Sequence, residues 1–196
     1  MRSLFEESAC SFWKRALEGY SEAVSDRAVS RLDDLDHWYH RELPRLLAAR
    51  VPPQMFSPEL VRVTEWKMKR GAFRGRNLFL VKSNDPDVVA RTTAEAFALV
   101  PHLKKPVARI SDLAGVGPAT ASAVLAALRP DLYPFFDEAV AEAIPGLGKA
   151  AFTLSYYEKY QGRLRERARE LSVVCTDVAW TAHLVGVALW AASGKK

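Results

Sequence analysis

The chain has 196 residues, of which 49% are hydrophobic and 26% are charged, so it is long and apolar enough for one domain with a sizeable core and is not a disordered chain. Its net charge of +5 favours a polyanionic partner without specifying which one. No stretch approaches about eighteen apolar residues and no apolar run follows the N-terminus, so we expect neither a membrane span nor a signal peptide.

The first part of the chain predicts two amphipathic helices. Ser3 and Glu6 form a capping box ahead of the first helix, on which Trp13 is a core residue. The second helix follows a break near Ser25 and is kinked or split by Pro44. It carries two histidines close to three aspartates, which together could ligate a metal. We favour a solvated face, because no further ligand has the right spacing. These residues are Asp33, Asp34, Asp36, His37 and His40.

A third helix, capped at Ser57-Pro58, leads into the densest basic patch of the chain. This basic block, residues 62–76, has six positive charges against Glu65, with Trp66 and Phe73 interleaved among them. Such mixtures are typical of surfaces that bind phosphates and stack bases, and a solvated charge run is the alternative. We predict nucleic-acid contacts from Lys67, Lys69, Arg70, Arg74 and Arg76.

After an apparently buried segment at 79–84, a helix capped by Asp85 runs to Pro101, and a hairpin follows. A short helix around Pro106–Leu113 meets a sharp turn at Gly115-Val116-Gly117. A second helix starts at Pro118, and the motif covers about residues 106–128. The free N–H groups at the start of that second helix, together with its positive dipole end, would form an anion site. On a nucleic acid the anion is a backbone phosphate.

The remaining chain predicts further helices and no sheet. One opens near Phe135, a charged helix covers 156–171, and Thr176-Asp177 caps the last. We interpret Gly146-Leu-Gly148-Lys149 as a connecting loop, because no apolar helical run follows it. Nothing alternates with period two for long enough to form a strand. The sequence therefore predicts a single all-α domain over 1–196, with about eight to ten helices.

The string Leu113-Ala-Gly-Val-Gly-Pro-Ala-Thr-Ala121 resembles the helix-hairpin-helix of DNA polymerase beta and of the DNA glycosylase superfamily that includes endonuclease III and the alkyladenine glycosylases. The likeness covers roughly Pro106 to Val140, and it implies a helix-hairpin-helix glycosylase-like fold. It also implies that the hairpin, with Gly115 and Val116 in its turn, binds DNA through the backbone N–H groups of Gly117, Ala119 and Thr120. The resemblance further implies that Na⁺ or K⁺ is held by the backbone carbonyls of Ser111, Leu113 and Val116.

The same resemblance assigns a catalytic carboxylate to Asp137. The family carries an essential Asp at the start of the helix after the hairpin, where it stabilises the cationic sugar left as the glycosidic bond breaks. An ordinary N-cap is the alternative role of Asp137. Bifunctional members carry a catalytic Lys where this chain has Ala119, so the likeness implies base release without strand cleavage. Two roles remain open for Tyr133, Phe135 and Phe136: they could line a pocket for the base, or they could belong to the core.

The basic block followed by such a hairpin also resembles an uncharacterised, glycosylase-like branch of that superfamily. We expect a protein that binds nucleic acid, double-stranded DNA in particular, either as a monofunctional DNA glycosylase or as a non-enzymatic binding or scaffold protein. A protein-interaction module is a third alternative. Cys10 and Cys175 form neither a metal-ligand spacing nor a four-cysteine iron–sulfur pattern, and they suggest a reducing compartment. We expect that no cofactor is required. We also expect an intracellular location, in the nucleus, the nucleoid or the cytoplasm.

Overall fold

The computed structural model describes residues 3–194, and those residues are all-α, as predicted, with no strand among them. They contain twelve α-helices, more than the predicted eight to ten, because the two long N-terminal helices are each broken. In chain order the elements are η1 (Leu4–Glu6), α1 (Cys10–Glu18), α2 (Tyr20–Ser25), α3 (Leu32–His37), η2 (Trp38–Glu42), α4 (Leu43–Ala48), α5 (Ser57–Arg70), α6 (Gly75–Lys82), α7 (Pro86–Ala98), α8 (Lys105–Ile110), α9 (Pro118–Leu128), α10 (Glu138–Glu142), α11 (Leu154–Val174) and α12 (Ala182–Ala192).

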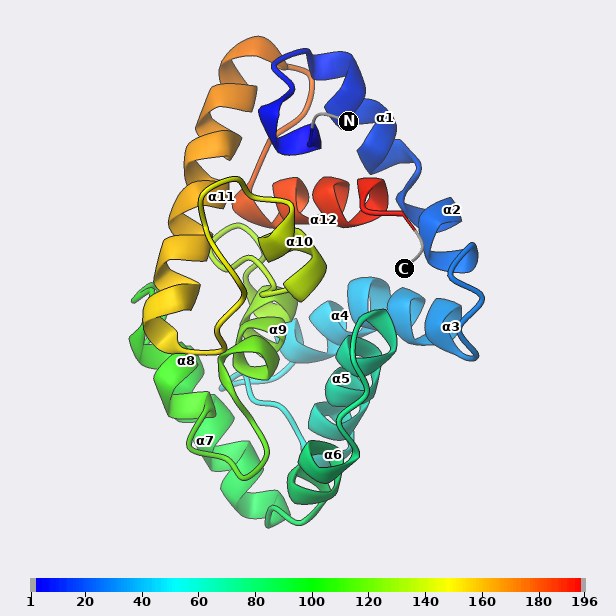
Figure 1. Ribbon diagram of the computed structural model, residues 1–196. Helices are drawn as coiled ribbons and strands as arrows, with labels where there is room; N and C mark the ends of the chain where they lie inside the picture. The colour runs from blue at the N-terminus through cyan, green and yellow to red at the C-terminus, as the bar shows by residue number, and fades with distance from the viewer. Residues whose placement is uncertain (1–2, 195–196) are drawn as a thin grey trace.

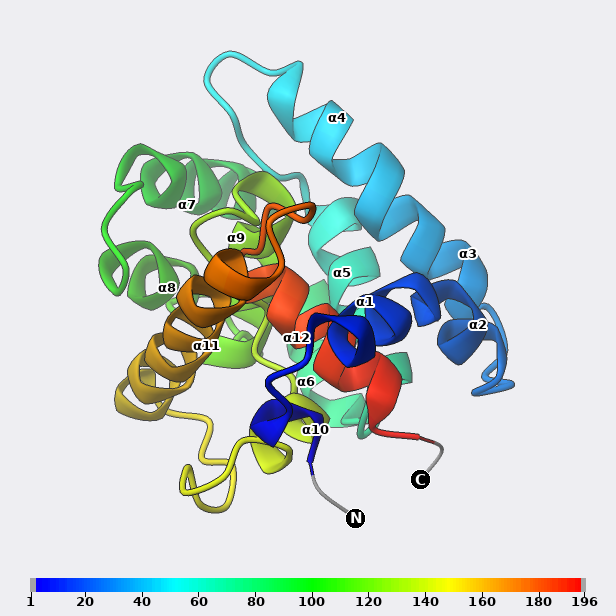
Figure 2. The same ribbon diagram turned by 90° about the horizontal axis from the view of Figure 1, so that it is seen from above.

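The first and last helices of the chain form one half of the molecule and the middle helices form the other (Figure 1). The apolar helix α12 packs against α1, α2, α10 and α11, and Figure 2 shows it near the centre of that group. In the other half, α5 packs against α3, α6, α7 and α9. The C-terminal end of α5 therefore reaches the boundary between the two halves. Within residues 3–194, no helix combines the length and the apolar character that a bilayer span requires.

Several local predictions are confirmed and others need correction. The capping box at Ser3 is present, Trp13 is fully buried, and the turn ahead of Pro44 widens into the π-helical η2. Two predicted caps are displaced. Phe56 precedes α5 as its N-cap, and Thr181, whose hydroxyl accepts from the Leu184 N–H at 3.1 Å, caps α12.

The segment 79–84, expected to be buried, instead ends the amphipathic helix α6. Val81 lies in the core, whereas Phe79 is 71% exposed, because a helical period turns the two side chains to different faces. The second Gly-x-Gly forms a connecting loop, as predicted, with φ of +75° at Gly146 and +76° at Gly148.

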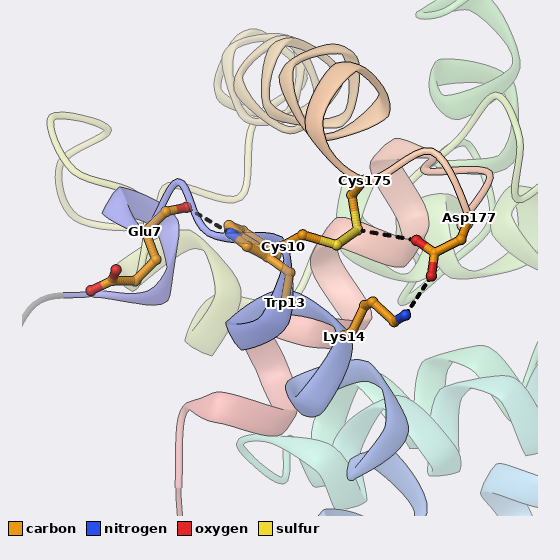
Figure 3. Close-up of a disulfide and its surroundings, with 6 residues drawn as sticks. All are labelled: Glu7, Cys10, Trp13, Lys14, Cys175 and Asp177. Carbon is orange, nitrogen blue, oxygen red and sulfur yellow. Dashed lines mark hydrogen bonds and ion pairs between the residues drawn. A yellow bond between two sulfur atoms is a disulfide. The ribbon is translucent and has the colours of Figure 1, made fainter.

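A disulfide between Cys10 and Cys175 joins the start of α1 to the end of α11 (Figure 3). The Asp177 carboxylate lies beside it, with Oδ1 3.7 Å from Cys175 Sγ, and pairs with Lys14. Contrary to our prediction, Asp177 therefore does not cap α12. The wide sequence separation of the cysteines gave no sign of this pairing, and the bonded pair removes the basis on which we expected a reducing compartment. Because the two sulfurs are bonded to each other, neither is a thiolate available to a metal.

Candidate functional site

A cavity of about 430 Å³ opens at the boundary between the two halves, and we call it the Asp137 pocket. Its walls come from the end of α5 and the loop after it, from the start of α10, and from two segments around Arg27 and Phe152 for which we predicted no functional role. Five cationic side chains and two carboxylates line it, together with three phenylalanine rings. These are Arg27, Lys67, Lys69, Arg70, Arg74, Asp137, Glu138, Phe135, Phe136 and Phe152.

Asp137 is an N-cap, which is one of the two roles that we considered for it, and it also lines the cavity. Its Oδ1 accepts from the Ala139 N–H at 2.9 Å, which caps α10. Its Oδ2 lies 3.4 Å from Nε of Arg70. The residue is only 6% exposed, so a ligand would have to enter the pocket to reach the carboxylate.

Arg70 departs most from the sequence expectation. We predicted that it contacts phosphate from the surface, but its side chain is 4% exposed and lies between the carboxylates of Asp36 and Asp137. The guanidinium also donates to the Tyr20 hydroxyl and lies 3.9 Å from the centre of the Trp190 ring. Burial opposes its charge, yet Tyr20, Asp137 and Asp36 together raise the pKa of Arg70. Arg70 therefore joins α5 to α2, α3, α10 and α12 and is not a free phosphate ligand.

The other cations of the basic block lie closer to solvent. Arg74 and Arg76 are exposed, and Lys69 is partly buried, with its Nζ donating to the Ser30 carbonyl at 2.6 Å. Lys67 lines the pocket, where burial and then the nearby charge of Arg74 lower its pKa. The carboxylates of Asp137 and Glu138 oppose this lowering of the Lys67 pKa, and burial remains its main cause.

The two aromatic rings of the block have different environments. Trp66 is buried in the core and stacks on Tyr39 with 3.6 Å between ring centres, whereas Phe73 is 73% exposed. Of the rings after the hairpin, Phe135 and Phe136 are buried and also line the pocket. Tyr133 is a core residue whose hydroxyl donates to the His102 carbonyl at 2.8 Å.

The α8–α9 hairpin is held tightly against α6. Gly115 has φ of +76°, and a Cβ there would lie 2.8 Å from Cβ of Leu80 and 2.9 Å from the Val81 nitrogen. The Asn84 side chain pairs with both the N–H and the carbonyl of Ala114, each at 2.9 Å. Because α6 begins directly after Arg74, one short helix joins the basic block to the hairpin.

The backbone groups of the hairpin are placed as follows. No side chain caps the start of α9 at Gly117, and a Cβ there would meet no atom within 4 Å. Ala119 and Thr120 are buried as whole residues, at 3% and 4% exposed, so their backbone N–H groups have little contact with solvent. Of the three predicted cation ligands, the Leu113 carbonyl accepts from the Val116 N–H at 3.1 Å, and Ser111 uses its hydroxyl on the Val107 carbonyl at 2.8 Å.

His37 lies on a solvated face, as in our preferred interpretation. His40 does not, so that interpretation is wrong for this residue. The Nε2 of His40 lies 3.2 Å from the Tyr20 hydroxyl and 3.7 Å from Oδ1 of Asp36. His183 lies beside it, with 6.0 Å between ring centres, and both line a second cavity of about 690 Å³. Burial, followed for His40 by the charge of Arg70 and for His183 by His40 and Arg70, lowers the pKa of each to about 3. Around His40, the described residues do not bring three metal-ligating side chains together.

The chain was compared with protein-family models, with curated proteins and with solved structures, and none of them matches it. A functional conclusion must therefore come from the residues of the pocket and the hairpin themselves.

Proposed function

We propose that this protein has a helix-hairpin-helix glycosylase-like fold, binds double-stranded DNA and acts as a monofunctional DNA glycosylase on a nucleotide flipped into the Asp137 pocket. The observation that carries the proposal is the position of Asp137, an almost buried carboxylate at the wall of a basic cavity that also contains aromatic rings. Enzymes that act on a base must take it out of the stack into such a pocket.

In the proposed reaction the bond between C1′ of the deoxyribose and the base nitrogen breaks, and the base leaves with the electron pair. Positive charge develops on the sugar, and the Asp137 carboxylate stabilises it. Water adds to C1′, and its proton is released, ultimately to the departing base. The products are a free base and an abasic site. Ala119 cannot form a Schiff base, so the strand stays intact.

Binding would combine the hairpin with the exposed cations of the basic block. The uncapped start of α9 offers backbone N–H groups to one phosphate, and Arg74 and Arg76 lie at the N-terminal end of the adjoining helix α6. Na⁺ or K⁺ on the carbonyls of Ser111, Leu113 and Val116 would add positive charge at the same phosphate. A DNA substrate implies a nuclear or nucleoid location.

A non-enzymatic DNA-binding protein is the second candidate, and a specific observation favours it. Both oxygens of Asp137 already have partners, the Ala139 N–H and the Arg70 guanidinium, which is what a purely structural N-cap requires. In that case the pocket walls would serve stability alone.

Two measurements on the full chain test the proposal. Duplex affinity is measured for the wild type and for Gly117→Asp, which places a negative side chain in open space at the start of α9. We expect strongly weakened binding with an unchanged helical circular dichroism spectrum; unchanged affinity would remove the hairpin from the interface. Base release is then measured on labelled duplexes containing uracil, hypoxanthine, oxidised or alkylated bases. Binding without release from any duplex would favour the second candidate.

A further inference from the structure

The charge of the Asp137 pocket indicates which bases it would accept, and this inference rests on the proposed function. We propose that the pocket selects nucleotides whose base is uncharged and rich in carbonyl acceptors, such as deaminated or oxidised bases, and excludes the cationic bases that ring alkylation produces.

The walls of the pocket carry an excess of positive charge. The pocket is lined by three more cationic side chains than carboxylates. Asp137, the more buried of the two carboxylates, already faces Arg70 at 3.4 Å, and Arg70 has a second partner in Asp36 outside the lining. A base carrying a full positive charge would therefore enter a region of net positive potential. This potential stabilises a bound nucleotide phosphate and destabilises a bound cationic ring.

The aromatic rings of the pocket would attract a cationic base through their faces if no cation lay close to them. The protein's own cations lie over two of the three rings, those of Phe152 and Phe135. Arg74 is 5.2 Å and Lys67 is 5.9 Å from the centre of the Phe152 ring, and Arg70 is 5.7 Å from that of Phe135. A cationic base would be repelled by these groups, whereas an uncharged base would not.

The cationic side chains of the pocket also favour ligands that accept hydrogen bonds. Lysine and arginine side chains only donate hydrogen bonds, and they supply five of the ten charged or aromatic side chains of the pocket. Carbonyl oxygens on a base edge accept from such donors. Ring alkylation leaves fewer acceptors and adds positive charge, so both changes disfavour the alkylated base.

The test uses two isomeric free nucleotides with the full chain. The base of N1-methyladenosine 5′-monophosphate is protonated at neutral pH, whereas that of N6-methyladenosine 5′-monophosphate is neutral, and both carry the same phosphate and sugar. Inosine 5′-monophosphate serves as the carbonyl-bearing ligand. By isothermal titration calorimetry at low salt, we expect the cationic isomer to bind at least about ten-fold more weakly than the neutral one. Inosine monophosphate should bind at least as tightly as the neutral isomer.

Two variants link the selectivity to the pocket. Arg74→Gln removes one cation that lines the pocket and should reduce the ratio between the dissociation constants of the two isomers. Arg169→Gln removes an exposed arginine of α11, which lies away from α5 and α6 in Figures 1 and 2, and should leave the ratio unchanged. Equal or tighter binding of the cationic isomer, or no measurable binding of any of the three nucleotides, would overturn the inference.

The outcome can be separated from that of the proposed function. If the neutral nucleotides bind selectively but no duplex is bound, the pocket inference stands and the glycosylase proposal fails. If the protein releases alkylated, cationic bases from duplexes, the glycosylase proposal stands and the selectivity inference fails.

Discussion

The Nε atom of Arg70 lies 3.4 Å from Oδ2 of Asp137, so the end of α5 fixes the carboxylate at the start of α10. The same guanidinium contacts Asp36, Tyr20 and Trp190, and thereby joins the two halves of the molecule beside the pocket. We expected the Arg70 side chain to bind DNA directly. It instead positions Asp137, the residue that we propose acts on the DNA.

Removing Arg70 should destabilise the fold strongly. Arg70→Met leaves two buried carboxylates, those of Asp36 and Asp137, without their cation, and breaking such a buried pair typically costs about 3–5 kcal/mol. Urea denaturation measures the change in the free energy of unfolding. Arg169→Met, at an exposed position of α11, should change stability by less than about 0.5 kcal/mol. A loss below about 1 kcal/mol for Arg70→Met would show that the buried pair is not a structural link.

The two hairpin glycines should respond differently to alanine. Gly115→Ala puts a Cβ into the backbone of α6 at a φ of +76°, and the fold should lose more than about 1 kcal/mol. Gly117→Ala meets open space at a negative φ and should be nearly neutral. Thermal unfolding of the two variants measures the difference. Equal stability would mean that the hairpin does not pack against α6 as described.

The exposed cations of the basic block should account for part of the salt dependence of duplex binding. Each phosphate contact contributes about −0.9 to the slope of log affinity against log salt. Replacing Arg74 and Arg76 by Ala should therefore flatten the slope by nearly two units without changing sequence preference. Arg169→Ala should leave it unchanged. An unaltered slope in the double variant would place these arginines away from the nucleic acid.

His183, which is buried, and His40, which is partly buried, should make the fold sensitive to acid. The pKa of His40 and of His183 is about 3 in the folded chain, against 6.5 when exposed. Between these values the unfolded state binds protons that the native state does not, so stability is complete above about pH 6.5 and falls as the pH is lowered. Each residue contributes on the order of 1 kcal/mol per pH unit.

Urea unfolding between pH 5 and pH 7.5 measures this dependence. His183→Gln should flatten it, whereas His102→Gln, at an exposed position, should not. An identical pH dependence in wild type and His183→Gln would contradict the burial of a neutral imidazole.

Local patterns in the sequence predicted the all-α class, the hairpin and the start of α10 at Asp137, because each depends on neighbouring residues. The burial of Arg70 had a local signal as well. Val63, Trp66 and Arg70 follow the helical spacing i, i+3, i+7, which places Arg70 on the buried face of α5. Its partners could not be predicted, because Asp36 and Asp137 come from distant segments. The disulfide between Cys10 and Cys175, 165 positions apart, was missed for the same reason.

The most direct test of the proposed function compares wild type with Asp137→Asn on a labelled duplex panel carrying uracil, hypoxanthine, oxidised or alkylated bases, with and without alkali. Asn keeps the shape and can still cap α10, but it carries no charge to stabilise the sugar cation. We expect wild type to leave an abasic site that breaks only after alkali, and Asp137→Asn to bind the duplex equally well without releasing the base. Direct strand cleavage by wild type, or an Asp137→Asn variant as active as wild type, would contradict the account.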